Sequence, residues 1–233
     1  MKKICILGDS HSAGFRLAWN DLEHTQKNAQ LTFFVDRGIW LTELEAGEQA
    51  LVPSNDRIRQ VIAHTSGGHE TVHFPSYDLV LFVGLIWGYP RVDGYFSRAS
   101  VRQALTDYLP TSVGFNILQK VRKVSDIPVF ISHSPLLAYG GAVEEDGDLE
   151  PYRQAVRYWN DELLAEFNAT MLEQPPETIT HGAYTKLEYS VGSTRLDIGD
   201  ELGGQIHPAR DRTHMNKQFG VSCLSRYLPQ LAA

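Results

Sequence analysis

The chain has 233 residues, 42% of them hydrophobic and 21% charged, and its 21 basic and 28 acidic residues give a net charge of −7. This length and composition are typical of one soluble globular unit, so we expect residues 1–233 to form a single domain. The chain has no Lys/Arg cluster, which argues against a nucleic-acid surface, and no apolar stretch long enough to span a membrane. These features argue against nucleic-acid and membrane partners, and the sequence does not specify an oligomeric state.

The first predicted strand is short and fully apolar, covering Ile4–Leu7. Gly8 and Asp9 then turn the chain, and apolar residues recur at helical spacing over residues 15–22. This strand–turn–helix order places Ser10 at the carboxyl edge of a sheet, near the N-terminus of a helix. A hydroxyl held there is a candidate nucleophile if a base reaches it. The turn is equally compatible with phosphate binding or a purely structural role.

Three more strands are predicted from apolar runs at residues 31–35, 77–84 and 128–132. Between the first two of these, residues 40–76 allow two interpretations. One is a helix over residues 56–64 capped by Ser54 or Asn55, and the other is a hairpin that turns at residues 66–68. Helices are predicted at residues 97–108 and 112–124.

In the last third of the chain, the apolar stripe from Tyr152 to Met171 predicts a long helix over residues 151–171. We expect the fifth strand at residues 177–181, and a long connection over residues 182–210 that contains a hairpin at 187–196. The alternation of strands and helices predicts one three-layer α/β/α sandwich with a mostly parallel sheet of about five strands.

The two cysteines, Cys5 and Cys223, lie in apolar segments, so we expect buried thiols and no disulfide. The basic start, residues 1–3, is followed by only four apolar residues before Gly8. Such a segment is too short for the core of a signal peptide, and the sequence therefore predicts a cytoplasmic protein.

Near the other end of the chain, Asp211 and His214 are three residues apart, just ahead of the last amphipathic stretch at residues 215–231. A carboxylate at this spacing can orient an imidazole that points at Ser10. Each residue also has an ordinary explanation, because Asp211 could pair with a neighbouring arginine and His214 could simply begin a helix capped by Asn216. Together with Gly-Asp-Ser, the pair favours a catalytic role.

A Gly8-Asp9-Ser10 start and an Asp211-x-x-His214 finish, in that order, resemble the first and last signature blocks of the SGNH/GDSL hydrolase family. The resemblance implies a sheet in flavodoxin-like order and the hydrolysis of a carboxylic ester. It assigns Ser10 as the nucleophile, His214 as the general base and Asp211 as the residue that orients His214.

The resemblance also implies donors for the oxyanion, namely the backbone amides of Ser10 and Gly38. The third donor of the family is an asparagine in a Gly-x-Asn-Asp block, where this chain reads Gly84-Leu85-Ile86-Trp87. Another donor could replace the asparagine, with His133 a candidate that is more simply explained as a core histidine. Alternatively, the enzyme uses two donors, or the site is a pocket that only binds. Loss of one donor typically slows such an enzyme about 10²–10³-fold, so an active esterase remains the favoured interpretation.

The substrate implied by the resemblance is a short acyl or O-acetyl group on a carbohydrate, with Trp87 and Tyr89 as aromatic residues that could stack on a sugar ring. The alternatives are an acyltransferase with the same triad, or a non-catalytic module that binds a glycan or metabolite. No cofactor is expected. His207, Asp211 and His214 could supply three metal ligands, but the chain has no His-Glu-x-x-His pair, so no metal is expected either.

Overall fold

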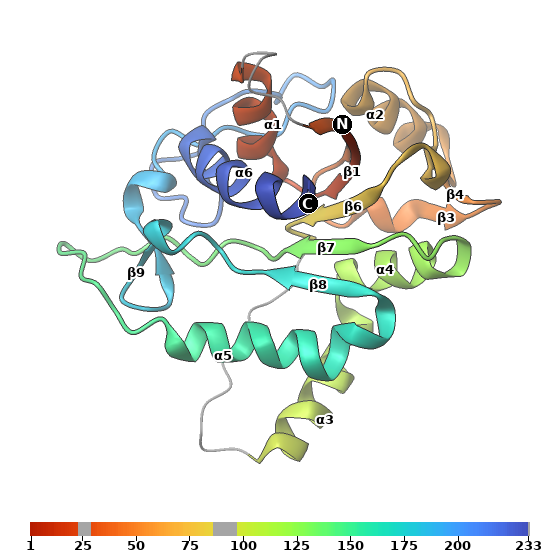
Figure 1. Cartoon of the computed structure of the whole chain (residues 1–233). Coiled ribbons are helices and arrows are strands. Elements are labelled where there is room, and N and C mark those ends of the chain that lie inside the picture. Colours follow the sequence, from red (N-terminus) through yellow and green to blue (C-terminus); the bar gives the residue numbers. More distant parts are fainter. Residues whose placement is uncertain (23–28, 86–96, 233) are drawn as a thin grey trace.

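The computed structural model describes residues 1–22, 29–85 and 97–232 (Figure 1). Its central sheet has five parallel strands in the order β2-β1-β6-β7-β8. Counted along the chain, these strands have the order 2-1-3-4-5, the flavodoxin-like order. The predicted fold class is therefore confirmed. The strands are β1 (Lys2–Gly8), β2 (Ala29–Val35), β6 (Leu79–Val83), β7 (Val129–Ser132) and β8 (Ala169–Leu172).

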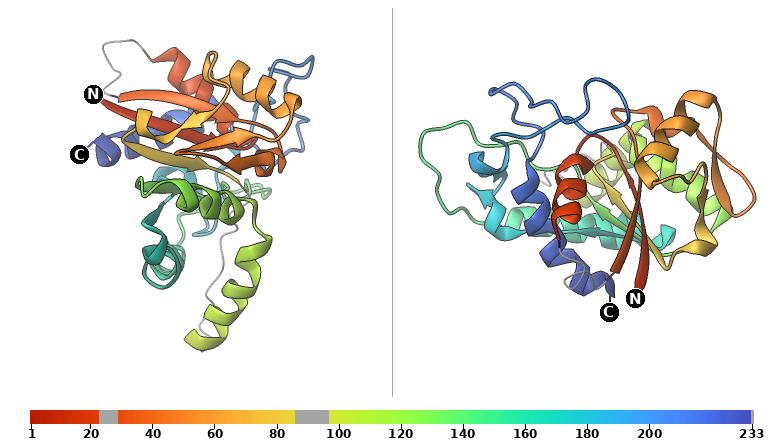
Figure 2. Two further views of the ribbon diagram at one scale, coloured as in Figure 1. Left: turned by 90° about the vertical axis from the view of Figure 1, so that its right-hand side faces the viewer. Right: turned by 90° about the horizontal axis from the view of Figure 1, so that it is seen from above.

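Helices cover both faces of the sheet, as Figures 1 and 2 show from three sides. One face carries Ile4 and Ile6 and packs against α1 and α6, and the other carries Cys5 and Leu7 and packs against α4 and α5. Because successive residues of a strand point to opposite faces, β1 is apolar throughout. The six α-helices of the described residues are α1 (Ser12–Asp21), α2 (Asp56–Ser66), α3 (Arg98–Tyr108), α4 (Val113–Val124), α5 (Glu150–Trp159) and α6 (Lys217–Ala232).

Residues 40–76 form both a helix and a small antiparallel sheet. The helical interpretation is confirmed, because α2 begins after Asn55, whose side chain accepts a hydrogen bond from the amide of Ile58. The predicted hairpin turn at residues 66–68 is wrong, since Gly67 ends α2 in the left-handed conformation with φ +80°. The antiparallel strands lie on either side of α2 in the sequence: β3 (Leu44–Ala46), β4 (Ala50–Pro53) and β5 (Val72–His73).

The helix predicted over residues 151–171 is regular only in its first half, and its last four residues are not helical. α5 ends at Trp159, a π-helical turn covers Asn160–Leu164, and a 3-10 turn covers Ala165–Phe167. The chain then reverses at Asn168, with φ +45°, into the edge strand β8. The side chain of Asn160 fixes this return, because it donates to the carbonyl of Met171 (3.0 Å) and accepts from its amide (2.7 Å).

The fifth strand of the central sheet is therefore β8, and the prediction that residues 177–181 form that fifth strand is wrong. There, a 3-10 turn (Pro176–Thr178) leads into β9 (Ile179–Thr180), which pairs only with β10 (Tyr184–Thr185). The hairpin predicted at residues 187–196 is also wrong. Instead, this segment begins with a 3-10 turn at Leu187–Tyr189, and in the loop that follows Thr194 pairs with Ile206. The remaining 3-10 turns of the described residues are Trp40–Glu43, Phe74–Ser76 and Leu109–Thr111.

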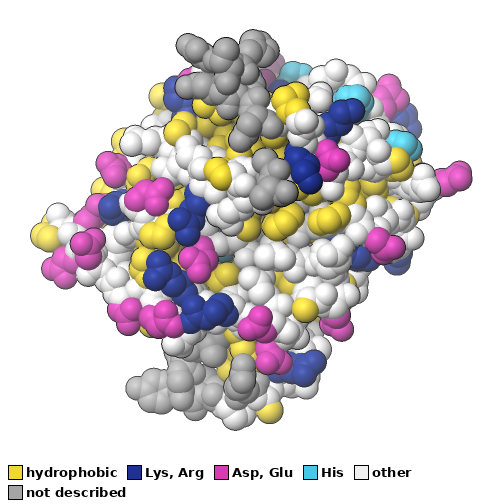
Figure 3. Space-filling model, viewed as in Figure 1, with side chains coloured by type: hydrophobic (Ala, Val, Ile, Leu, Met, Phe, Trp, Pro, Cys, Tyr) yellow, Lys and Arg dark blue, Asp and Glu magenta, His cyan; other side chains and the backbone are white. Residues whose placement is uncertain are grey.

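Cys5 and Cys223 are buried free thiols, as predicted. Among the described helices, none has the length and apolar character needed to cross a bilayer. On the face of the molecule shown in Figure 3, acidic and basic side chains are interspersed, and no large patch of one sign forms there.

Candidate active site

Ser10 lies in the turn between β1 and α1. Gly8 ends β1, an interior strand of the parallel sheet that lies between β2 and β6. The buried carboxylate of Asp9 shapes the turn, because its oxygens accept hydrogen bonds from the amides of His11 (2.9 Å) and Leu85 (2.8 Å). The nucleophile candidate is thus held at the carboxyl edge of the sheet, where α/β proteins of this topology place their binding sites.

Asp9 also fixes the start of the segment after β6. A Cβ on Gly84 would lie 2.2 Å from Oδ1 of Asp9, and Gly84 has φ +73°, so no side chain fits at this position. The next residues belong to the predicted oxyanion block and aromatic loop. Ile86, Trp87 and Tyr89 lie outside the described residues.

The other half of the site comes from the segment before α6, and a close helix crossing brings it to Ser10. A Cβ on Gly14 would lie 2.5 Å from the carbonyl oxygen of Asn216, and a Cβ on Gly220 would lie 2.2 Å from the carbonyl oxygen of Gly14. The backbones of α1 and α6 therefore touch. Asn216 caps α6, since its side-chain oxygen accepts from the amide of Phe219 (3.2 Å).

Ser10, His214 and Asp211 form one hydrogen-bonded chain. The Oγ atom of Ser10 lies 3.1 Å from Nε2 of His214, and Nδ1 of His214 lies 2.9 Å from Oδ2 of Asp211. Within the described part of the chain, Asp211 forms ion pairs only with His207 and His214, and not with its neighbours Arg210 and Arg212. The structure thus brings together the three residues that the sequence predicts as nucleophile, base and orienting acid.

The backbone holds the carboxylate of Asp211 in place. Its Oδ1 atom accepts hydrogen bonds from the amides of Thr213 and His214, both at 2.9 Å. Burial raises the pKa of Asp211, but the hydrogen bonds from the amide and ring of His214 and from the amide of Thr213 outweigh burial and hold this pKa well below its ordinary value. Asp211 is therefore charged at neutral pH and favours the Nδ1–H tautomer of His214.

Two further histidines lie against the ring of His214. The ring of His207 is parallel to it, with an interplanar angle of 6° and centroids 4.0 Å apart. On the nucleophile's own turn, the ring of His11 lies 5.4 Å from that of His214. Burial lowers the pKa of both His11 and His207, and the charge of His214 lowers both further. The sequence groups His207 with Asp211 and His214 only as possible metal ligands and does not single out His11, because only the packing shows these ring contacts.

His207, Asp211 and His214 also meet the distance requirement for three metal ligands, since one ligand atom of each lies within 4.8 Å of the others. Their orientation suits a metal ion less well. Ring lone pairs lie in the ring plane, so two parallel stacked imidazoles do not converge on one ion. By contrast, the side chains of Ser10, His214 and Asp211 can transfer a proton in the positions that they already occupy.

The amides predicted as oxyanion donors belong to neighbouring turns. The amide of Asp36 donates to the carbonyl of Gly8 (3.1 Å), so the turn that contains Gly38 follows β2 beside the turn that contains Ser10. Within the described residues, the amides of Ser10 and Gly38 donate to no other protein group.

His133, the other donor candidate, is buried and engaged elsewhere. Its Nδ1 atom lies 2.7 Å from the carbonyl oxygen of Ser134, and its Nε2 atom lies 2.8 Å from the hydroxyl of Tyr152. Burial lowers the pKa of His133. The interpretation of His133 as a core histidine is confirmed.

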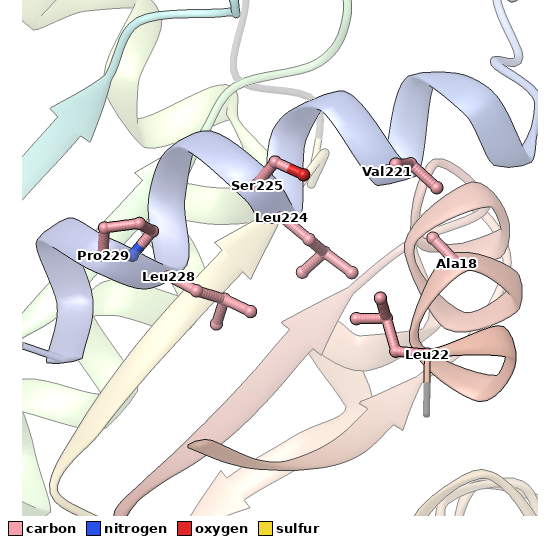
Figure 4. A pocket seen from close by; sticks show the side chains of 7 residues that line it. All are labelled: Ala18, Leu22, Val221, Leu224, Ser225, Leu228 and Pro229. Carbon is pink, nitrogen blue, oxygen red and sulfur yellow. The ribbon is translucent and has the colours of Figure 1, made fainter. Parts of the chain in front are cut away.

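An apolar groove of about 160 Å³ lies between α1 and α6 (Figure 4). Its lining contains no titratable side chain, and on α1 it involves only the C-terminal end of the helix and the residue after it, away from Ser10. The lining residues are Ala18, Leu22, Val221, Leu224, Ser225, Leu228 and Pro229.

No family model matches this sequence, and no curated protein resembles it in sequence. Three solved structures are similar in fold. A lipopolysaccharide acetyltransferase periplasmic domain from Salmonella ser. Paratyphi A has 11% identity and a TM-score of 0.49, with 100% of this chain and 84% of that chain covered. A proposed arylesterase from Agrobacterium tumefaciens str. C58 has 17% identity and a TM-score of 0.40, with 99% and 98% covered. A carbohydrate esterase with divergent catalytic and non-catalytic binding functions has 10% identity and a TM-score of 0.38, with 98% and 65% covered. These similarities are remote and concern the fold alone.

Proposed function

We propose that this protein is a serine esterase that cleaves carboxylic esters through an acyl-enzyme on Ser10. The observation that carries the proposal is the continuous chain from Ser10 through His214 to Asp211, with donor–acceptor distances of 3.1 and 2.9 Å. A hydroxyl, a base and an orienting carboxylate in this geometry are the parts that acyl transfer requires.

The proposed reaction begins when Ser10 Oγ attacks the ester carbonyl while Nε2 of His214 takes its proton. Asp211 stabilises the imidazolium that forms. The amides of Ser10 and Gly38 donate hydrogen bonds to the negative oxygen of the tetrahedral intermediate. As this intermediate collapses, His214 returns the proton to the leaving alcohol. A water molecule, activated by His214, then hydrolyses the acyl-enzyme by the same steps.

The substrate that we propose is a short acyl group, such as acetyl, esterified to a carbohydrate hydroxyl. The support for it is the resemblance of the two signature blocks to SGNH/GDSL hydrolases. The aromatic residues proposed to stack on a sugar ring, Trp87 and Tyr89, lie outside the described residues.

The direct test is labelling of the folded protein with a fluorophosphonate, which reacts with activated serines, followed by peptide mapping. We expect the label on Ser10, with none in a Ser10→Ala variant. Ser12→Ala is the matched control, because the hydroxyl of Ser12 is buried and donates to the carbonyl of Asp9 (2.6 Å). Labelling of another serine, or none in the folded wild type, would refute the assignment.

A further inference from the structure

A cavity of about 120 Å³ lies between α1 and the loop over residues 194–204. This volume is several times the ~10–15 Å³ that one water molecule needs. The α1 residues of its wall recur every three or four positions, so they share one face of the helix. The lining residues are Ala13, Arg16, Leu17, Asn20, Thr194, Arg195, Leu196, Asp197 and Gly204.

The two arginines of this wall are not paired with acids. Arg16 donates to the backbone carbonyl of Asp197 (2.7 Å), and neither Arg16 nor Arg195 forms an ion pair within the described residues. By contrast, the nearby Arg37 is paired with the carboxylate of Asp200. Since the chain has seven more acidic than basic residues, a shortage of acids does not explain the two unpaired guanidinium groups.

Partial burial strengthens the case for Arg16. Burial lowers its pKa, and the charge of Asp197 acts in the opposite direction. An arginine nonetheless stays protonated at any physiological pH. A partly desolvated guanidinium with free N–H groups binds an oxyanion more strongly than a solvated one, because less water screens the interaction.

Asp197 adds one negative charge to the wall, but its carboxylate is already engaged. Its Oδ1 atom accepts from the amide of Gly199 (2.9 Å) and lies 3.1 Å from Nε2 of His64. The hydrogen bond from Gly199 outweighs partial burial and holds the pKa of Asp197 below its ordinary value. Its side chain is 53% exposed, so water screens its charge. With two arginines and one aspartate, the wall keeps a net positive charge.

Both walls of the cavity connect directly to the triad. On the helix side, the amide of Ala13 donates to the carbonyl of Ser10 (3.3 Å). On the loop side, Thr194 pairs with Ile206, and the next residue, His207, stacks on His214. In Figures 1 and 2 this loop, drawn in blue, lies beside the N-terminal half of the chain that carries α1 and α2. The cavity is therefore bounded by the helix that begins directly after Ser10 and by the loop that leads to His207, the stacking partner of the base.

We propose that Arg16 and Arg195 form a subsite for a carboxylate or phosphate group on the alcohol part of the ester that Ser10 attacks. The inference rests on the proposed esterase function, in which the acyl part is small and the alcohol part is the larger, recognised portion. It narrows the substrate class to esters of anionic alcohols.

The kinetic test compares three acetate esters of similar phenols: methyl 4-acetoxybenzoate, which is neutral, 4-acetoxybenzoate and 4-acetoxyphenyl phosphate. The measured quantity is the ratio of kcat/KM for each anionic ester to that for the neutral ester. Because Arg195→Gln removes a hydrogen bond between two charged groups, it should lower this ratio at least about tenfold. Arg16→Gln should act in the same direction. Arg59→Gln, an exposed arginine of α2, is the control and should leave the ratio unchanged. The anionic ester whose ratio falls more in Arg195→Gln carries the group, carboxylate or phosphate, that the subsite prefers.

A second measurement does not depend on turnover. Inorganic phosphate, compared with chloride at equal ionic strength, should raise the Tm of the wild type and of Arg59→Gln, and not that of Arg195→Gln. If the kcat/KM ratio and the change in Tm caused by phosphate were the same in the wild type and in all variants, the proposed subsite would be refuted. The esterase function would not be affected by that result. If the wild type hydrolyses no ester, the proposed function fails. The Tm measurement then decides by itself whether the anion site exists, because phosphate should raise the Tm of the wild type and not that of Arg195→Gln.

Discussion

The imidazole rings of His207 and His214 lie parallel, with centroids 4.0 Å apart, and the Nδ1 atoms of both face the same oxygen of Asp211. Asp211 holds one edge of the His214 ring, and His207 covers one face of it. Stacked aromatic pairs contribute about 0.5–1.5 kcal/mol beyond burial. We therefore predict that the orientation of the proposed base depends on both neighbours, with His207 as a positioning residue.

Replacing His207 tests this role. His207→Ala should lower kcat by about two- to tenfold with little change in KM, because the loss acts through His214 and not through bound substrate. His207→Phe keeps a flat ring against His214 and should recover most of the loss. Steady-state kinetics on a neutral acetate ester measures both values. Equal losses in the two variants, or a change in KM alone, would contradict the role of the stack.

Asp211→Asn should keep the fold and lose about 10⁴-fold in kcat, because an amide at this position favours the wrong tautomer of His214. The amides of Thr213 and His214 can still donate to the side-chain oxygen of asparagine, so the loop before α6 should be retained. Asp56→Asn, an exposed residue of α2, is the matched control and should keep wild-type activity. A loss of only a few-fold in Asp211→Asn would show that the acid does not orient the base.

Stability should fall as the pH decreases below about 6.5. Burial lowers the pKa of His11, His133 and His207 in the folded protein. The unfolded chain, whose histidines titrate near ~6.5, then binds protons that the folded chain does not, and protonation favours unfolding. The stability that these three histidines contribute in their neutral form is fully present above pH ~6.5 and is lost as the pH falls below that value. Asp211, with its lowered pKa, adds a loss of the same sign only below about pH 4.

Urea unfolding at pH 7.5, 6.5 and 5.5 measures this dependence. His133→Gln removes one buried titrating group, so the free energy of unfolding should decline less steeply with decreasing pH than in the wild type. The exposed His73 provides the control substitution, His73→Gln. An unchanged pH dependence in His133→Gln would show that His133 is not held neutral by its burial.

Four of the five strands of the sheet could be predicted from the sequence, because each is an apolar run that ends at a turn residue or a polar residue. The fifth, β8, could not. Its residues Ala169–Leu172 continue the apolar spacing of α5, so periodicity alone extends the helix through them. What separates helix from strand is the left-handed Asn168 and the hydrogen bonds from Asn160, which pattern reasoning does not capture.

The site shows the same division. Ser10, Asp211 and His214 could be selected because Gly-Asp-Ser near one end and Asp-x-x-His near the other together favour a catalytic role, although each motif alone has an ordinary explanation. His11, His207 and Arg195 acquire meaning only from their packing. His11 is adjacent to Ser10 in the sequence, but its contact with His214 spans more than 200 residues and depends on how closely α1 and α6 cross. That crossing in turn depends on two glycines.

Gly220→Ala tests whether the close crossing of α1 and α6 sets the geometry of the site. In an isolated helix, alanine is more favourable than glycine by about 1 kcal/mol, so propensity alone predicts stabilisation. Here a Cβ on Gly220 would lie 2.2 Å from the carbonyl oxygen of Gly14, and backbone atoms cannot rotate away.

We therefore expect Gly220→Ala to be destabilised by about 1–3 kcal/mol, the range for overpacked sites. The two helices must separate, which moves the segment carrying His214 away from Ser10. The kcat should therefore fall even at temperatures at which the variant is still folded. Thermal unfolding and kinetics below the transition separate the two effects. Ser225→Ala on the same helix, in the apolar groove, is the control and should change neither by much. A Gly220→Ala protein with wild-type stability and activity would show that the helix crossing does not position the base.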